Sequence, residues 1–487
     1  MSKINHTANI HNLALAGHRA SGKTSLADAL LFQAKAVDRK GNVDDGSSVS
    51  DHDEEEKKHR YSIDTSVLHL EHAGKHVNIL DTPGAPDFVG NALEALNAVE
   101  TVLVVVSAVN GVEVNTRRMF NEAGKRGLAR MLIINKLDAE NLKPFTETYA
   151  TIRETFGKAC VLFNAPLDPG PNLKGTVCLL DPPPDGMTGC PIDFATARSQ
   201  LIDAVVEADE ELMAKYLDGQ TISHDELVHA LPKALESGTL IPIFCASAKK
   251  GIGIAELLEA VDEYTLPPLL GKKRVAHKRN GSETVEVELQ PDPAAECVGQ
   301  VFKIVNDKFV GALSFIRLYS GCYKPDQAMI NARTDRGGRP GGIMLVQGNK
   351  MTPIPEAVAG DIFAVSKLED MHIGDTVGTS AHPPRLPEPN FPMPLFGLAV
   401  QPKTRGDEQK ISGSLAKIAN EDPTFKVSRD PQTHEMVITG MSQLHLDLIQ
   451  ERLKRRFGLE VVTHEPKIPY RETIMVPGEG NYRHKKQ

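Results

Sequence analysis

Hydrophobic residues in the first half of the chain fall into short continuous runs that are separated by longer stretches of mixed character. Residues 13–16, 102–106 and 131–134 are such runs. Continuous apolar runs of this length are typical of strands in a parallel sheet, because helices cover both faces of such a sheet. The pattern therefore predicts an α/β domain with a mostly parallel, doubly wound sheet over residues 1–268.

Two further apolar runs predict a hairpin at one edge of this sheet. They span residues 66–71 and 75–80, and turn residues separate them at 72–74. Residues 38–60, which precede the hairpin, are polar and charged and cannot bury a core. We expect this segment to be mobile until a ligand orders it. A plain solvated loop is the alternative interpretation.

The second half of the chain shows two other patterns. Short strands alternate with glycine turns over residues 297–380, which predicts an all-β barrel domain at residues 291–385. Residues 395–474 follow the order β-α-β-β-α-β, which predicts an α+β ferredoxin-like domain at residues 386–474. The basic and polar residues 269–290 indicate a linker before the barrel.

Composition restricts what these domains can do. The chain has 487 residues, of which 40% are hydrophobic, so it can form three or four domains with their own cores. Its net charge of −9 gives no overall basic field for nucleic acid, so such a contact would need a local patch. The 6 cysteines are scattered, which predicts free thiols in a reducing cytosol. No apolar export segment or run of about 18 apolar residues is present, so we expect a cytoplasmic protein that does not enter membranes.

The first predicted strand leads into Gly-His-Arg-Ala-Ser-Gly-Lys-Thr at residues 17–24. This spacing is that of a phosphate-binding loop, in which backbone N–H groups and a helix N-terminus hold phosphate oxygens. Lys23 would neutralise the β- and γ-phosphates, and the hydroxyl of Thr24 would bind Mg²⁺. The loop residues expected to contact the nucleotide are Gly17, His18, Arg19, Ala20, Ser21, Gly22, Lys23, Thr24 and Ser25.

The predicted hairpin ends in Asp81-Thr82-Pro83-Gly84. A carboxylate at the C-terminal end of a strand can sense a triphosphate through Mg²⁺, and the N–H of the following glycine can meet the γ-phosphate. Residues 38–60 lie between the phosphate loop and this motif, which favours a nucleotide-sensing switch. The expected catalytic residues are Lys23, Asp81 and Gly84.

Two later motifs predict the base that is bound. The strand at residues 131–134 is followed by Asn135, Lys136 and Asp138 in the pattern N-K-x-D. The carboxylate of Asp138 can accept from N1–H and the exocyclic amine of guanine, a donor pattern that adenine lacks. After a strand at 241–245, the backbone of Ser247, Ala248 and Lys249 can reach the guanine carbonyl. Together the motifs predict a domain that binds GTP or GDP with Mg²⁺.

With these motifs in place, residues 11–265 resemble the G domain of translational GTPases, specifically that of elongation factor G. An insert between Asp138 and Ser247, expected at about residues 155–240, is similar to the extra subdomain of that family. The predicted barrel resembles the family's second domain. Residues 440–446 and 469–474 look like its third domain and the exit from that domain.

The resemblance implies a GTPase that converts GTP to GDP and phosphate and thereby drives conformational change on the ribosome, in the class of elongation and translocation factors. It implies ribosomal RNA and ribosomal proteins as partners, and we expect a monomer. Residues 475–487 would begin the family's fourth domain, which would make the chain either a fragment or a naturally shortened relative. A ribosome-protection or peptide-release GTPase, which shares the first three domains, is an alternative.

The chain departs from the family pattern at three positions. Ala85 stands where the family has a histidine that positions the attacking water, and Ala20 stands where it usually has an aspartate. Ser62 aligns with the threonine that binds Mg²⁺, so the expected metal ligands are Thr24, Ser62 and Asp81. The chain therefore looks like a member of the elongation factor G-like side branch, with slow intrinsic hydrolysis. A non-hydrolysing, GTP-gated regulator that binds ribosomes is the competing hypothesis.

Overall fold

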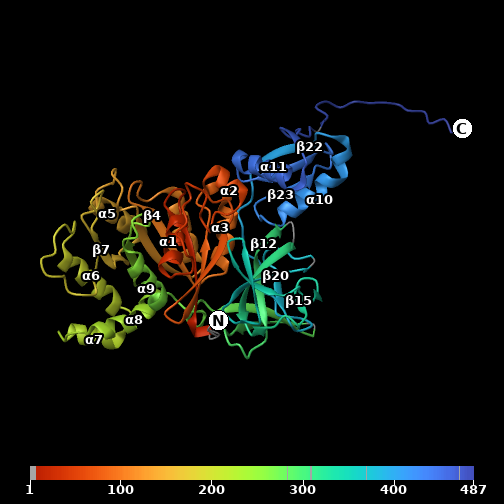
Figure 1. The fold of residues 1–487 in the computed structure, drawn as a ribbon. Coiled ribbons are helices and arrows are strands. Elements are labelled where there is room, and N and C mark those ends of the chain that lie inside the picture. The colour runs from red at the N-terminus through yellow and green to blue at the C-terminus, as the bar shows by residue number, and fades with distance from the viewer. Residues whose placement is uncertain (1–6, 282, 308–309, 369, 471, 487) are drawn as a thin grey trace. The chain divides into compact units, whose positions relative to one another are not determined.

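The chain forms two compact units in the computed structural model, which describes residues 7–281, 283–307, 310–368, 370–470 and 472–486 (Figure 1). The first unit consists of Met1–Pro392 with Asn420–Pro423, and the second of Met393–Ala419 with Thr424–Gln487. The first unit contains an α/β domain and an all-β domain, and the second is a small α/β domain.

A seven-stranded sheet forms the centre of the α/β domain. In spatial order its strands are β2 (Ser66–His72), β3 (Lys75–Asp81), β1 (Ile10–Gly17), β4 (Thr101–Ser107), β5 (Ala129–Asn135), β9 (Ile241–Cys245) and β6 (Cys160–Leu162). β2 pairs antiparallel with β3, and the other neighbours are parallel. The predicted parallel sheet with a hairpin at its edge is confirmed. Every residue of β1 and β4 is buried, which explains why these strands read as continuous apolar runs.

Helices cover this sheet, and they follow its strands in the alternating order that parallel strands require. Their bounds are α1 (Lys23–Gln33), α2 (Glu54–His59), α3 (Val89–Asn97), α4 (Val114–Lys125), α5 (Phe145–Phe156) and α9 (Ile254–Tyr264), with short 3₁₀ turns at η1 (Thr7–Asn9), η2 (Pro86–Phe88) and η3 (Pro268–Leu270). Among the described residues, no helix combines the length and the apolar character needed to span a membrane.

The polar segment 38–60 contains the helix α2, which the sequence analysis did not predict. Asp53 and Glu56 form a capping box at its start, with the Asp53 side chain accepting from the N–H of Glu55 at 2.9 Å. Glu56 is buried, and its Oε1 accepts from the N–H groups of Ile63 and Asp64 at 3.0 and 3.1 Å. Local capping therefore gives this charged segment a helix without an apolar core.

The insert lies between β5 and β9. It contains a small hairpin and three helices: β7 (Asn164–Leu167), β8 (Gly175–Cys178), α6 (Phe194–Val206), α7 (Glu210–Leu217) and α8 (His224–Ser237). β6 falls within the range that we predicted for the insert, yet it extends the main sheet by pairing in parallel with β9. All three residues of β6 are buried, which explains its place at the sheet.

An antiparallel hairpin occupies most of the segment that we predicted as a linker. It consists of β10 (Arg274–Asn280) and β11 (Glu283–Leu289). β11 alternates valine with glutamate, and the basic strand β10 faces this acidic strand, as in the pair His277 and Glu286. Such cross-strand pairs stabilise two strands that bury little surface of their own.

The all-β domain confirms the predicted barrel class. Its main sheet has eight strands, in the order β16-β15-β21-β12-β13-β20-β17-β18, and β14 pairs with β19. Bulges in β12 at Val298/Gly299 and Val301/Lys303 bend it around a core that includes Phe363. The strands are β12 (Val298–Asp307), β13 (Gly311–Ser320), β14 (Cys322–Tyr323), β15 (Met329–Asn331), β16 (Arg336–Gly338), β17 (Ile343–Gln347), β18 (Lys350–Ile354), β19 (Ala357–Val358), β20 (Ile362–Ser366) and β21 (Thr376–Gly378).

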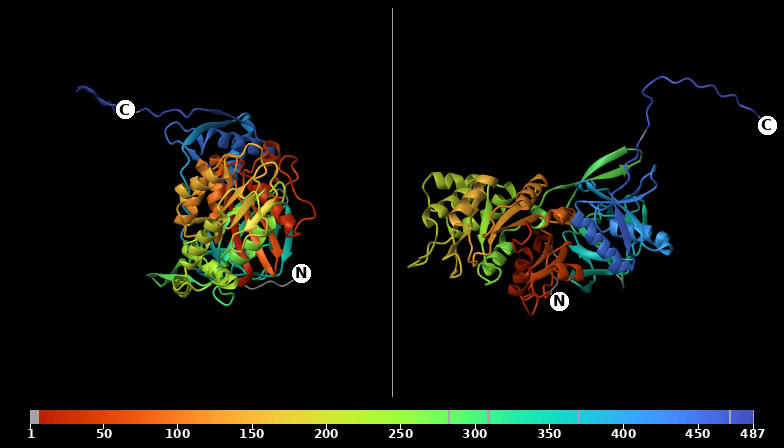
Figure 2. Two further views of the ribbon diagram at one scale, coloured as in Figure 1. Left: turned by 90° about the vertical axis from the view of Figure 1, so that its left-hand side faces the viewer. Right: turned by 90° about the horizontal axis from the view of Figure 1, so that it is seen from above.

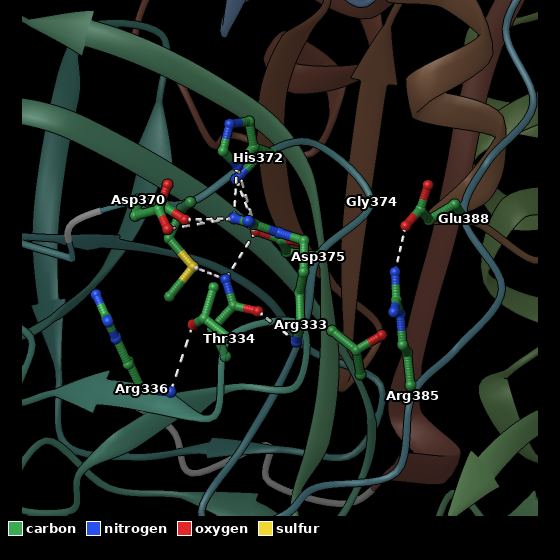
Figure 3. A network of polar contacts seen from close by, with 12 residues as sticks. Arg333, Thr334, Arg336, Asp370, His372, Gly374, Asp375, Arg385 and Glu388 are labelled. Carbon is green, nitrogen blue, oxygen red and sulfur yellow. Dashed lines mark hydrogen bonds and ion pairs between the residues drawn. The ribbon is translucent and has the colours of Figure 1, made fainter. Parts of the chain in front are cut away.

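A polar network fixes the turns at one end of this domain (Figure 3). Arg333 donates through Nε to Oδ1 of Asp375 at 2.8 Å and through Nη2 to the carbonyl of Asp370 at 2.7 Å. Nδ1 of His372 lies 2.7 Å from the same Nη2. One guanidinium therefore joins the turn after β15 to the loop that leads into β21.

The second unit has the ferredoxin-like order that we predicted. Its elements are β22 (Phe396–Pro402), η4 (Arg405–Asp407), α10 (Glu408–Ala419), β23 (Lys426–Arg429), β24 (Met436–Gly440), α11 (Gln443–Phe457) and β25 (Val461–His464), and its antiparallel sheet has the order β23-β24-β22-β25. Ile411 and Leu446 from the two helices pack in one core with Val400 of the sheet. After β25 the described residues form neither helix nor strand (Figure 2).

A buried ion pair joins the α/β domain to the barrel within the first unit. Arg317 of β13 lies with Nη2 2.7 Å from Oε1 of Glu100, and their side chains are 1% and 6% exposed. Oε2 of Glu100 accepts from Asn12 Nδ2 at 2.9 Å, and Asn12 also donates to the carbonyl of Gly360 at 3.1 Å. The pair is therefore embedded in hydrogen bonds that cross between the two domains.

We expect Arg317→Met to lower the free energy of unfolding of the first unit by about 3–5 kcal/mol, because it leaves the buried carboxylate of Glu100 without its counter-ion. Arg279→Met is the matched control, since Arg279 pairs with Asp335 at 3.3 Å but its side chain is 72% exposed. Exposed pairs contribute about 0–1 kcal/mol. Chemical unfolding of both variants measures the difference, and equal losses would contradict the assignment.

Candidate nucleotide-binding site

The phosphate-loop motif forms the turn between β1 and α1. Gly17 and Gly22 both adopt positive φ, 142° and 92°, and a side-chain carbon would collide with the carbonyl of Val105 at Gly17 and with the Asn135 amide at Gly22. Glycine is therefore required at both ends of the loop. Of the residues predicted to contact the nucleotide, 17–22 thus form the turn that leads from the end of β1 to the helix, and Lys23, Thr24 and Ser25 form the first turn of α1.

Lys23 is buried at the start of α1. Its side chain is 5% exposed, and Nζ donates to the carbonyl of His18 at 3.0 Å. Burial lowers the pKa of Lys23 to about 8, although the charges of Asp81, Asp51 and Glu113 act in the opposite direction. A cation that has lost water in this way gains strongly from an anionic ligand.

The three residues predicted to hold Mg²⁺ come together. Oγ1 of Thr24 lies 3.1 Å from Oγ of Ser62, and Asp81 accepts from Ser50 Oγ at 2.7 Å. Burial raises the pKa of Asp81, while hydrogen bonds from Ser50 and Thr24 and the charge of Lys23 lower it. Within the described residues, the buried Oδ1 of Asp81 has no hydrogen-bond partner. Two hydroxyls and a carboxylate with an unsatisfied oxygen fit the hard oxygen ligands that Mg²⁺ prefers.

Two further carboxylates lie beside these ligands, and the sequence analysis missed both. Asp51 is 4% exposed, and burial together with the charge of Asp81 raises its pKa to about 7. Asp28 of α1 is fully buried, accepts from the N–H of Val49 at 3.2 Å, and has its pKa raised by burial to about 6. Nothing in the sequence distinguishes Asp51 from the other acidic residues of segment 38–60, because only the fold turns it inward.

The D-T-P-G motif lies directly against the phosphate loop. A side-chain carbon at Gly84 would collide with Lys23 Nζ and with the backbone nitrogen of Arg19. Thr82 donates through Oγ1 to the carbonyl of Leu15 at 2.7 Å, which ties the motif to β1. The predicted catalytic set of Lys23, Asp81 and Gly84 is thus gathered at one place.

Asn115, at the start of α4, joins the two phosphate motifs, and no sequence motif identified it. It is buried, and its Nδ2 donates to the carbonyl of Gly84 at 2.9 Å and to that of Gly17 at 3.3 Å. Glu113 is the residue directly before α4, and its Oε1 lies 3.5 Å from Nε2 of His18. The first turn of α4 therefore fixes the position of Gly84 in the D-T-P-G motif relative to Gly17 in the phosphate loop.

The motifs assigned to guanine also meet. Asn135 donates through Nδ2 to the carbonyl of Ser21 at 3.1 Å, and its Oδ1 accepts from the N–H of Ala248 at 3.0 Å. Asp138 accepts from Ser247 Oγ at 2.6 Å. Asn135 thus links the phosphate loop to the segment of Ser247, Ala248 and Lys249. Lys136, the next residue after Asn135, has a positive φ of 67°.

Lys40 is a further residue at this end of the site that the sequence analysis missed. Its Nζ donates to the carbonyls of Ala248 and Lys249. Burial lowers the pKa of Lys40, and the charges of Asp28 and Asp138 oppose that shift. The loop after α1 therefore packs against the segment that is expected to read the base.

Comparisons with known proteins match the three domain types of the chain. The family model for the elongation factor Tu GTP binding domain matches residues 8–267, that for elongation factor G domain 2 matches residues 296–380, and that for elongation factor G domain III matches residues 391–465. An elongation factor G-like protein of Thermotoga maritima is 32% identical over 486 residues, which are 98% of this chain and 70% of that protein. A crystal structure of a protein from Thermus thermophilus superposes with a TM-score of 0.81 at 30% identity, over 95% of this chain and 68% of the other.

We expect Asp138→Asn to lower GTP affinity at least about tenfold and to introduce xanthine nucleotide binding, since one buried acceptor is worth about 1–3 kcal/mol. The contact with Ser247 can survive, because asparagine keeps one oxygen. Equilibrium binding of both nucleotides measures the change, and Asp185→Asn, at an exposed position, is the control. Unchanged guanine preference would refute the assignment of Asp138.

Thr24→Ala should weaken Mg²⁺-dependent binding of GTP more than that of GDP, because only the triphosphate engages both switch segments around the metal. Titrations with and without Mg²⁺ test this, with Thr146→Ala on the exposed face of α5 as the control. An equal loss for both nucleotides would instead indicate a misfolded loop.

Proposed function

Because the chain belongs to the elongation factor G type of translational GTPases, we propose that it binds GTP with Mg²⁺, hydrolyses it to GDP and phosphate, and uses this cycle to change conformation on a ribosome. The observation that carries the proposal is the convergence of Thr24, Ser62 and Asp81 beside the buried Lys23. These groups come from three separate segments of the chain.

Each part of the site has its own role in this proposal. The backbone of residues 17–22 and the ammonium of Lys23 bind the phosphates, and the N–H of Gly84 meets the γ-phosphate. Asp138 binds guanine, with Asn135 and Lys136 holding the loop and residues 247–249 facing the base carbonyl. Thr24, Ser62 and Asp81 would hold Mg²⁺, whose chemistry when bound is to neutralise charge on the β- and γ-phosphates.

The hydrolytic step is expected to be slow without a ribosome. Ala85 is 4% exposed and precedes η2, and its methyl group can neither donate to nor accept from a water. The charge of Lys23 and the metal ligands remain in place. We therefore expect nucleotide binding to be independent of the side chain at position 85. Orientation of the attacking water, in contrast, should depend on that side chain.

A ribosome is the partner that we propose, with contacts to ribosomal RNA and ribosomal proteins, and we place a monomeric protein in the cytoplasm. The support is the family and the presence of its first three domain types in this chain. A second candidate function is a GTP-gated regulator that binds ribosomes without hydrolysis. Ala85 is the observation that favours this second candidate.

We expect the protein to bind GTP and GDP tightly and to hydrolyse GTP very slowly on its own. The hydrolysis rate should be about 10²–10⁴-fold lower than in a site that has a water-orienting side chain. Ala85→His should raise the rate only when ribosomes are present, with a further gain from Ala20→Asp. Single-turnover phosphate release, with and without ribosomes, measures these rates.

Ala73→His is the control, because it adds the same side chain to the exposed turn between β2 and β3. Fast release by the unmodified protein on ribosomes would remove the non-hydrolysing alternative and show that a histidine at position 85 is dispensable.

A further inference from the structure

Arg19 lies in the middle of the phosphate loop, and its side chain has no role in the site described above. The side chain is exposed, and its guanidinium carbon lies 4.2 Å from the centroid of the Tyr61 ring. A guanidinium over the face of an aromatic ring is attracted by the electrons of the ring. Arg19 is therefore directed toward the segment that follows α2 and not toward bulk solvent alone.

Tyr61 belongs to the same segment as a proposed metal ligand. It directly precedes Ser62, whose hydroxyl lies 3.1 Å from that of Thr24. The Tyr61 ring also stacks on Phe88, with centroids 6.2 Å apart and planes at 19°. Phe88 ends η2, which begins one residue after Ala85. The guanidinium of Arg19 thus lies on a ring that itself packs against the segment after Ala85.

The backbone places Arg19 at the reacting end of the nucleotide site as well. A side-chain carbon at Gly84 would collide with the backbone nitrogen of Arg19 and with Lys23 Nζ. Gly84 is the residue whose N–H we assign to the γ-phosphate. The side chain of Arg19 therefore starts beside the position at which that phosphate would lie.

The other two basic side chains of the loop, His18 and Lys23, have contacts of their own. Nε2 of His18 lies 3.5 Å from Glu113, which turns this ring toward α4. Lys23 Nζ donates to the backbone of its own loop. The guanidinium of Arg19, in contrast, reaches from the loop to the Tyr61 ring in the segment after α2.

We propose that Arg19 is a catalytic residue of this GTPase, an arginine supplied by the chain itself that neutralises charge on the γ-phosphate in the transition state. The inference rests on the proposed function. In the reaction, a water oxygen forms a bond to the γ-phosphorus, the bond from that phosphorus to the bridging oxygen breaks, and its electron pair stays with GDP. The proton lost by the water ends on the released phosphate.

A guanidinium suits this task because its planar fork can donate two parallel hydrogen bonds to phosphate oxygens. Arginines that perform it in other GTPases act in cis or in trans, and they stabilise charge that develops only in the transition state. The contact with Tyr61 is weak at an exposed site, so Arg19 can exchange it for the phosphate at little cost. Tyr61 acts as a positioning residue, which keeps the guanidinium near the phosphate before the reaction.

The experiment compares single-turnover phosphate release on ribosomes with equilibrium affinities for GTP and GDP. We expect Arg19→Ala to slow release at least about tenfold and to change either affinity less than about threefold, because the interaction is made in the transition state. Arg19→Lys keeps the charge but not the fork, and should recover only part of the rate. Arg117→Ala, at an exposed arginine on α4, is the matched control and should leave the rate unchanged.

Variants of Tyr61 provide an independent test of the same proposal. Tyr61→Phe keeps the aromatic face and should release phosphate at the wild-type rate, whereas Tyr61→Ala should slow release about as much as Arg19→Lys does. In the Arg19→Ala background, Tyr61→Ala should have no further effect on release, because its action is exerted through the arginine.

Three results would overturn the inference. Unchanged or faster release by Arg19→Ala would show that the arginine does not assist the reaction. Parallel losses of affinity, rate and melting temperature would indicate a structural role. Both of these outcomes leave the proposed function standing, since the wild-type protein still turns over GTP. A wild-type protein that binds GTP but releases no phosphate on ribosomes would refute both proposals at once.

Discussion

Burial of opposite charges at the start of α1 and at the C-terminal end of β3 is the constraint on which the rest of the site depends. Lys23 and Asp81 are removed from water together, and each has its pKa displaced toward the neutral form by that burial. Asp51 and Asp28 add two more carboxylates whose pKa values are raised to about 7 and about 6. Such a cluster is stabilised by ligands that bring both charge signs, as a nucleotide phosphate with Mg²⁺ does.

Buried amides hold this cluster in register with the rest of the domain. Asn135 joins the phosphate loop to the segment at Ala248, and Asn115 joins Gly17 to Gly84. Each amide connects elements that are far apart in sequence but adjacent in the fold. Because a buried amide has to satisfy its own donors and acceptor, such contacts leave few alternative arrangements. The segments that we assign to the base and to the phosphates are thereby parts of one scaffold.

The same logic appears at the junction of the α/β domain with the barrel, where Arg317 meets Glu100. The pair is deeply buried; Asn12 donates to Glu100, and the carbonyl of Gly360 accepts from both Asn12 and Arg317. It gives the first unit a polar junction with defined geometry. A junction of this kind favours one docking arrangement of the two domains, since any other would leave a charge buried without a partner.

Features that depend only on residues close together in the sequence were predictable from the sequence. The phosphate loop, the parallel strands and the ferredoxin-like order follow from spacing, continuous burial and helix periodicity within short windows. The residues assigned to phosphate, guanine and metal also lie at one site, because parallel strands deliver their C-terminal ends to the same edge of a sheet. The hairpin β10–β11 was not predicted, because its basic and polar character was interpreted as a linker and the alternation of valine with glutamate in β11 was overlooked.

The amino-acid sequence by itself thus determined the class of each domain and the motifs of the site, whose chemistry resides in a few consecutive residues. Only the tertiary structure decided which single residues surround those motifs. Asp51 and Asn115 carry no distinctive spacing, and the aromatic partner of the Arg19 side chain lies on another segment. Arg317 and Glu100 are 217 residues apart. Contacts of this separation exist only after the chain has paid the entropy of folding, so no local window of the sequence contains them.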